Sequence, residues 1–325
     1  MLKINHWRTF IGFTLLSITV LTLLGLTVYE AWLFHSIGGV LNVFLFIGAV
    51  TAIILEAKQL KFATANNPEW ITQIWQLFSV FAAGIVTYGM SHDLGLGPVI
   101  SASVIALLAH MISPKYSVSA YCGSFVGMTS ELLLSNYQEV ALASFIAGIV
   151  FFLTSDTFNG FGGKLGTIAL LSTAITCHSL NRDFLTLSIA DSQTNIWIIL
   201  VATFAAAITY YFNVHQKQGP VLASAVVGIV GAMILPPLFP EIGNTLVVVA
   251  ICASFTGMTS KERCGVFCNI FITGVLTGIL FVYSTPQLAG AGGKLGTIAF
   301  GSILSTYGYR NLLSGFQKKR KTELQ

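Results

Sequence analysis

Long apolar runs separated by short polar segments fill most of the chain. The runs cover residues 9–29, 38–56, 71–90, 98–113, 117–134, 140–156, 165–180, 195–213, 219–236, 243–259, 265–284 and 295–310. Each run comes close to the ~20 residues that a helix needs to cross the hydrocarbon core of a bilayer. The apolar residues do not alternate with polar ones, which excludes the strands of a membrane barrel. The pattern predicts an all-α, polytopic membrane protein with about 12 transmembrane helices.

The chain contains an internal repeat. The octapeptide GGKLGTIA stands at 162–169 and again at 292–299, so its two copies lie 130 residues apart. At the same spacing, residues 124–130 (SFVGMTS) match residues 254–260 (SFTGMTS) at every position but one. Upstream, the tripeptide at 97–99 matches the one at 219–221, only 122 residues later. Two copies of one unit explain these matches, with extra residues in the Pro-rich stretch of the second copy.

Each copy of the unit holds five predicted spans, at 71–180 and 195–310. Because five is odd, the second copy enters the membrane from the side opposite to the first. We therefore expect two inverted five-helix repeats preceded by two extra helices, an arrangement typical of transporters. The expected divisions are 1–66 for two N-terminal helices, 67–186 for repeat 1, and 187–325 for repeat 2 with a basic cytoplasmic tail.

Composition and charge agree with a membrane protein. The chain is 54% hydrophobic and only 9% charged, whereas soluble domains carry about 25% charged residues. The net charge of +4 lies in short basic clusters between apolar runs, so we expect no nucleic-acid partner. With both termini inside, these clusters follow the positive-inside rule, as expected in a bacterial cytoplasmic (inner) membrane. They comprise Lys58, Lys61, Lys115, Lys164, Lys217, Lys261, Arg263 and the tail residues Lys318, Lys319, Arg320 and Lys321.

The repeated Gly-Gly-Lys motif is the first candidate for a substrate site. Glycines allow the backbone to unwind, and each motif opens an apolar run, so a helix N-terminus would lie beside an ammonium. Such a place suits an anion or a strongly polar group. Two other interpretations remain: a lysine that reaches the membrane surface, and glycines that only let helices pack closely. The candidates are Gly162, Gly163, Lys164, Gly166 and Thr167 with Gly292, Gly293, Lys294, Gly296 and Thr297.

The hydroxyl residues of the second repeated segment are further candidates. Thr129 and Ser130, with Thr259 and Ser260, are expected either to line a polar passage or to bond their own helix carbonyls. Glu131 follows the first pair inside an apolar stretch. It is a candidate for proton coupling, with a position at the water boundary as the alternative.

No enzyme signature is found in the sequence. HExxH, GxSxG and Walker-type motifs are absent, and none of the five cysteines forms a CxxC pair. We expect no catalytic residue, cofactor or metal.

The expected function is membrane transport of a small anionic or polar solute, through a site between the inverted repeats. The alternatives are a passive channel for a small neutral solute, and a membrane scaffold or sensor without transport. Expected partners are the small-molecule or ion substrate and the lipid bilayer; homo-oligomerisation is left open.

Overall fold

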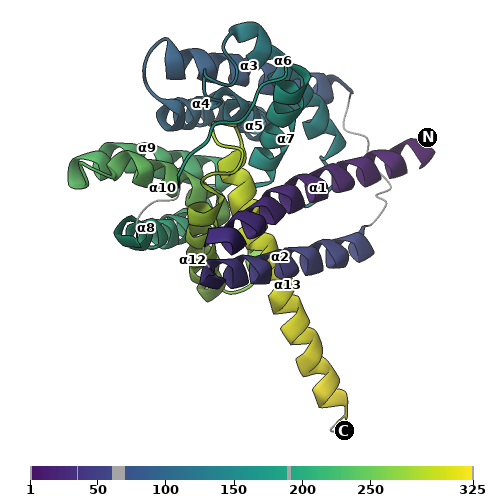
Figure 1. Ribbon diagram of the computed structural model, residues 1–325. Helices are drawn as coiled ribbons and strands as arrows, with labels where there is room; N and C mark the ends of the chain where they lie inside the picture. Colours follow the sequence, from purple (N-terminus) through teal and green to yellow (C-terminus); the bar gives the residue numbers. More distant parts are fainter. Residues whose placement is uncertain (1, 35, 61–69, 189–191, 324–325) are drawn as a thin grey trace.

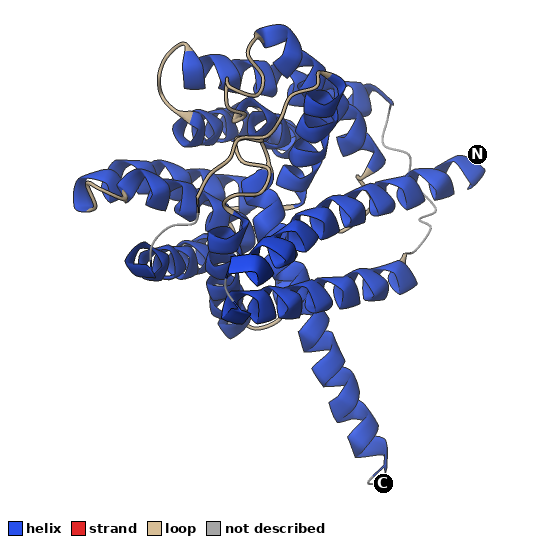
Figure 2. Cartoon of the chain, viewed as in Figure 1, coloured by secondary structure: helices blue, strands red, loops and turns tan. Residues whose placement is uncertain are grey.

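The computed structural model describes residues 2–34, 36–60, 70–188 and 192–323, and in this part of the chain the fold is all-helical (Figure 2). Two predictions lie outside the described residues: the division at residue 66 and the position of Lys61. The side chains of the basic tail are not described either. Within these ranges, thirteen α-helices are joined by loops and by two short segments, η1 and η2. The single bridge between extended segments joins Leu185 to Ala289 within the same described residues.

In chain order, the elements are α1 (Leu2–Phe34), α2 (Ser36–Gln59), α3 (Trp70–His92), α4 (Pro98–Ile112), η1 (Pro114–Tyr116), α5 (Ser117–Gly127), α6 (Tyr137–Leu153), α7 (Lys164–Ser179), α8 (Ser192–Tyr210), η2 (Tyr211–His215), α9 (Pro220–Leu238), α10 (Gly243–Gly257), α11 (Lys261–Cys264), α12 (Phe267–Ser284) and α13 (Lys294–Glu323).

Six helices in the described residues are long and apolar enough to cross a membrane, which is consistent with a membrane protein. The segments are Trp7–Leu33, Gly38–Gln59, Trp70–His92, Gln193–His215, Pro220–Leu238 and Phe267–Ser284. Several other predicted spans form shorter helices. The prediction of a span over 117–134 is wrong in length, because α5 ends at Gly127. Eleven residues extend only about 16 Å, roughly half of the hydrocarbon core.

The apolar run continues beyond α5 as a buried turn. Leu133 and Leu134 are almost fully buried, and their backbone N–H groups both donate to the carbonyl of Ser130. The next helix, α6, starts at Tyr137 and is capped by Asn136, whose side-chain oxygen accepts from the N–H of Glu139 at 3.0 Å. Hydrophobicity therefore reflects burial of a loop at this place and not continuation of the helix.

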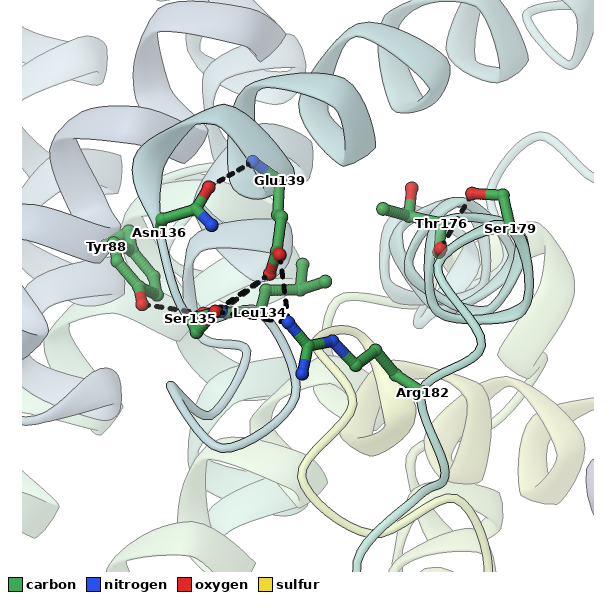
Figure 3. A network of polar contacts seen from close by, with 8 residues as sticks. All are labelled: Tyr88, Leu134, Ser135, Asn136, Glu139, Thr176, Ser179 and Arg182. Atoms are coloured by element: carbon green, nitrogen blue, oxygen red, sulfur yellow. Dashed lines mark hydrogen bonds and ion pairs between the residues drawn. The ribbon is translucent and has the colours of Figure 1, made fainter.

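A polar network holds this loop against its neighbours (Figure 3). Arg182, just after α7, donates to a carboxylate oxygen of Glu139 at 3.1 Å, and the other oxygen accepts from the N–H of Ser135 at 2.7 Å. The hydroxyl of Tyr88 in α3 donates to the carbonyl of Leu134 at 2.7 Å. The ends of α3, α5 and α7 and the start of α6 are thereby tied together.

Helices α3–α7 and α8–α13 have matching local geometry. Non-glycine residues with the same left-handed φ of 49° occur at Phe158 and Leu288, 130 residues apart. Glycines with positive φ recur at the same spacing, at 160 and 290 and at 163 and 293, and 122 residues apart at 97 and 219. The backbone of the two segments therefore turns alike at the positions where the sequences match.

Helices α1 and α2 lie beside each other and against α13, whose last turns extend away from the bundle (Figure 1). Arg8 near the start of α1 forms an ion pair with Asp156, and Phe13 stacks on Phe158 with ring centroids 4.9 Å apart. Near the other end of α1, Glu30 accepts from the amide of Gln287 at 3.2 Å. Helix α1 thus contacts the loops that precede both α7 and α13.

Candidate functional site

The two Gly-Gly-Lys motifs form the starts of α7 and α13. Gly163, which precedes α7, has φ 80°, and Gly293, which precedes α13, has φ 87°. This left-handed conformation is available to glycine at little steric cost, which explains a glycine at both positions. The lysines are the first helical residues, and no side chain caps the N-terminus of α7. In each of the two helices, the free N–H groups of the first turn therefore lie close to the ammonium of its own lysine.

Each motif docks onto the other half of the molecule. The N–H of Gly162 donates to the hydroxyl of Thr259 at 3.3 Å, and the N–H of Gly292 donates to the hydroxyl of Thr129 at 3.1 Å. The neighbouring residues form hydrogen bonds between backbone groups. The N–H of Ser260 donates to the carbonyl of Gly160, and the N–H of Ser130 donates to the carbonyl of Gly290, both at 2.9 Å. The ends of α10 and α5 hold the starts of α7 and α13 by the same contacts.

The threonines have their hydrogen-bonding groups engaged. Besides accepting from the glycines, the hydroxyl of Thr129 donates to the carbonyl of Val126 at 2.6 Å, and that of Thr259 donates to the carbonyl of Thr256 at 2.7 Å. Both side chains are buried. Of the two interpretations from the sequence, the structure places these threonines at helix ends, where they fix the loops. Buried Thr167 and Thr297 likewise donate to the carbonyls at the start of their own helices.

Helices α7 and α13 cross at Gly166 and Gly296. A Cβ atom on either glycine would lie 2.6 Å from the Cα atom of the other. Only two glycines permit this approach of the two backbones. The crossing brings the starts of the two helices, and with them both lysines, to the centre of the contact between the halves.

Two cavities flank this crossing. The Lys294 cavity has a volume of about 410 Å³, and the Lys164 cavity has a volume of about 400 Å³. The first is lined by residues 289–296, at the start of α13, together with residues of α3, α4, α5, α10 and α12. The second is lined by residues 159–165, at the start of α7, together with residues of α3, η1, α5, α6, α9 and α10. Volumes of this order suit small-molecule ligands.

The linings of the two cavities correspond almost residue by residue. Most residues of the Lys294 cavity have a partner in the Lys164 cavity at the repeat spacing. From the helices and the residues next to them, the pairs are Pro98 with Pro220, Val99 with Val221, Phe125 with Phe255, Met128 with Met258, Val248 with Val118, Phe255 with Phe125, Phe281 with Phe151, and Thr285 with Ser155. From the segments that carry the lysines, the pairs are Ala289 with Asn159, Gly290 with Gly160, Ala291 with Phe161, Gly292 with Gly162, Gly293 with Gly163, Lys294 with Lys164, and Leu295 with Leu165. The cavities are therefore two versions of one site.

Phe125 and Phe255 line both cavities and lie between them. Their ring centroids are 4.6 Å apart with an interplanar angle of 52°, and their exposed fractions are 2% and 1%. The sequence places both residues in the matched segments, yet nothing there distinguishes them from other buried aromatics. Their significance follows only from the cavities on either side.

The remaining candidates have different surroundings. Ser130 and Gly296 line the Lys294 cavity, whereas Ser260 and Gly166 line neither cavity. Glu131 lies outside the cavities with a side chain that is 66% exposed, and one of its oxygens is 3.7 Å from Nδ1 of His92. The sequence candidates that line the cavities are therefore the Gly-Gly-Lys motifs, Gly296 and Ser130. Comparison with known protein families, curated proteins and solved structures finds no match to this chain.

Proposed function

We propose that the protein transports a small solute across the membrane, along a path that joins the Lys294 cavity to the Lys164 cavity between Phe125 and Phe255. The observation that carries this proposal is the pair of equivalent cavities that share these two rings. A binding site placed between two related halves is the arrangement that transport proteins use. These rings are the residues that the two cavities have in common.

For this path to cross the membrane, the two repeats must be inverted, and the contacts of α1 support that orientation. Asp156 and Gln287 precede α7 and α13 at nearly equivalent positions, and they contact Arg8 and Glu30 of α1. Those two positions are 22 residues apart, or about 33 Å along a helix. Since α1 is itself long and apolar enough to cross a bilayer, equivalent loops lie near its opposite ends. By the positive-inside rule, the basic loops favour an orientation with Lys164 on the cytoplasmic side of a bacterial inner membrane.

The simultaneous presence of both cavities favours a channel-like path over alternation of the two halves. In an alternating carrier the site opens to one side at a time, through relative movement of the repeats. In this molecule the halves interlock at Gly166 and Gly296, where the backbones are in direct contact. Movement of the Phe125 and Phe255 side chains opens the path without breaking that contact.

Flux into proteoliposomes tests this function. We expect purified protein to accelerate the entry of small solutes down their gradients, measured by stopped-flow light scattering against protein-free vesicles. Flux that is indifferent to proton and sodium gradients supports the channel, whereas gradient-driven accumulation supports a carrier with Glu131 as the first coupling candidate. Absence of flux across a panel of ions and neutral solutes would contradict transport and favour the scaffold alternative.

A further inference from the structure

The two repeated lysines have unused hydrogen-bonding capacity. The ammonium of Lys294, whose exposed fraction is 8%, donates to the carbonyl of Thr285 at 2.8 Å. The ammonium of Lys164 donates to the side-chain oxygen of Asn159 at 3.1 Å. Neither lysine takes part in an ion pair within the described residues. Because an ammonium has three N–H donors, each lysine can bind a further acceptor.

The lining of each cavity contains a second basic side chain besides the lysine. His92 adds a second basic side chain to the Lys294 cavity, and Lys115 adds one to the Lys164 cavity. No aspartate or glutamate of the described chain is among the residues that line either cavity. Asp156, whose charge acts on Lys164, is itself paired with Arg8. A cation that enters either cavity meets like charge, whereas an anion supplies the partner that the ammonium lacks.

The rest of the lining limits the kind of anion. Phe125, Met128 and Val248 in one cavity, and their partners in the other, leave few polar groups to replace a hydration shell. The pair of phenyl rings between the cavities requires a solute to lose water when it passes. A singly charged, weakly hydrated anion meets this requirement at lower cost than a multivalent one.

We infer that the two cavities are matched binding sites for a small monoanion, such as nitrate, chloride or a short carboxylate, with Lys294 and Lys164 each holding it on one side of the phenyl pair. This inference rests on the proposed function and names its substrate class. The repeat supplies one lysine to each face of the barrier, which explains why the full Gly-Gly-Lys motif is present in both halves.

The test compares three classes of solute in one proteoliposome assay: nitrate, chloride and formate; sulfate; and the neutral solutes urea and glycerol. The variants are Lys164→Gln, Lys294→Gln and the double variant. Lys261→Gln is the matched control, because Lys261 is exposed and lines neither cavity. We expect the natural chain and the control to pass monoanions in preference to sulfate. Loss of a charged hydrogen-bond donor should lower monoanion flux by about tenfold or more in the double variant.

A binding measurement separates a lost site from a damaged fold. Nitrate should raise the unfolding temperature of the natural chain and of Lys261→Gln in detergent, and should leave that of a folded double variant unchanged. Neutral solutes that pass while monoanions do not, or lysine variants that match the control, would overturn this inference and leave the transport function standing. If no solute of any class passes, the proposed transport function itself fails.

Discussion

Replacement of both Phe125 and Phe255 by alanine is expected to raise solute flux by about tenfold or more, since a barrier lower by about 1.4 kcal/mol has that effect. The two rings lie 4.6 Å apart and are the residues common to both cavities. We therefore expect their removal to join the two cavities. Discrimination by size should weaken at the same time. The measurement is stopped-flow flux of a graded series of solutes into proteoliposomes.

Phe300→Ala is the matched control for this change. Phe300 is fully buried and packs on Phe158 and Phe161, but it lines neither cavity. Each such truncation costs about 3–5 kcal/mol of stability, so only variants that elute as the natural chain in size-exclusion chromatography are compared. Equal flux through the double variant and the natural chain would show that the rings do not limit passage.

Gly166→Ala and Gly296→Ala are expected to destabilise the protein by about 1–3 kcal/mol or more, the usual cost of overpacking. The new Cβ atom would lie 2.6 Å from a Cα atom of the facing helix, and a backbone atom cannot move away as the end of a side chain can. The loss should appear as a lower unfolding temperature in detergent for each variant.

Gly25→Ala in α1 provides the comparison. The nearest atom to a Cβ at this position is Cε2 of Phe46, at 3.9 Å, which is ordinary contact. Alanine favours a helix over glycine by about 1 kcal/mol, so this variant should be at least as stable as the natural chain. If Gly166→Ala unfolds at the temperature of Gly25→Ala, then α7 and α13 do not cross closely.

The sequence predicted the all-α membrane class because this class depends only on long apolar runs, which lipid can solvate. It did not predict where helices stop inside those runs. The run over 117–134 joins α5 to a loop whose leucines, Leu133 and Leu134, are as buried as any helical residue. Hydrophobicity records burial but not backbone conformation, so a short helix followed by a buried turn has the pattern of one long helix.

The candidate site was predicted in part. The repeated octapeptide alone singled out Lys164 and Lys294, because duplication of a charged residue inside apolar sequence needs a reason. The role of Thr129 and Thr259 depends on contacts more than 90 residues away in the chain, with Gly292 and Gly162. Phe125 and Phe255 could not be separated from other phenylalanines, since only the arrangement of helices puts a cavity on each side of them.

Side-specific cysteine labelling tests most directly whether the two cavities open on opposite sides of the membrane. Met128 lines the Lys294 cavity, and Met258, its partner in the repeat, lines the Lys164 cavity. Each is replaced by cysteine in a Cys268→Ser background, because the other four natural cysteines are buried. A membrane-impermeant thiol reagent should modify Met128→Cys only from the periplasmic side and Met258→Cys only from the cytoplasmic side. Modification of both from one side would contradict the inverted repeats and the path between them.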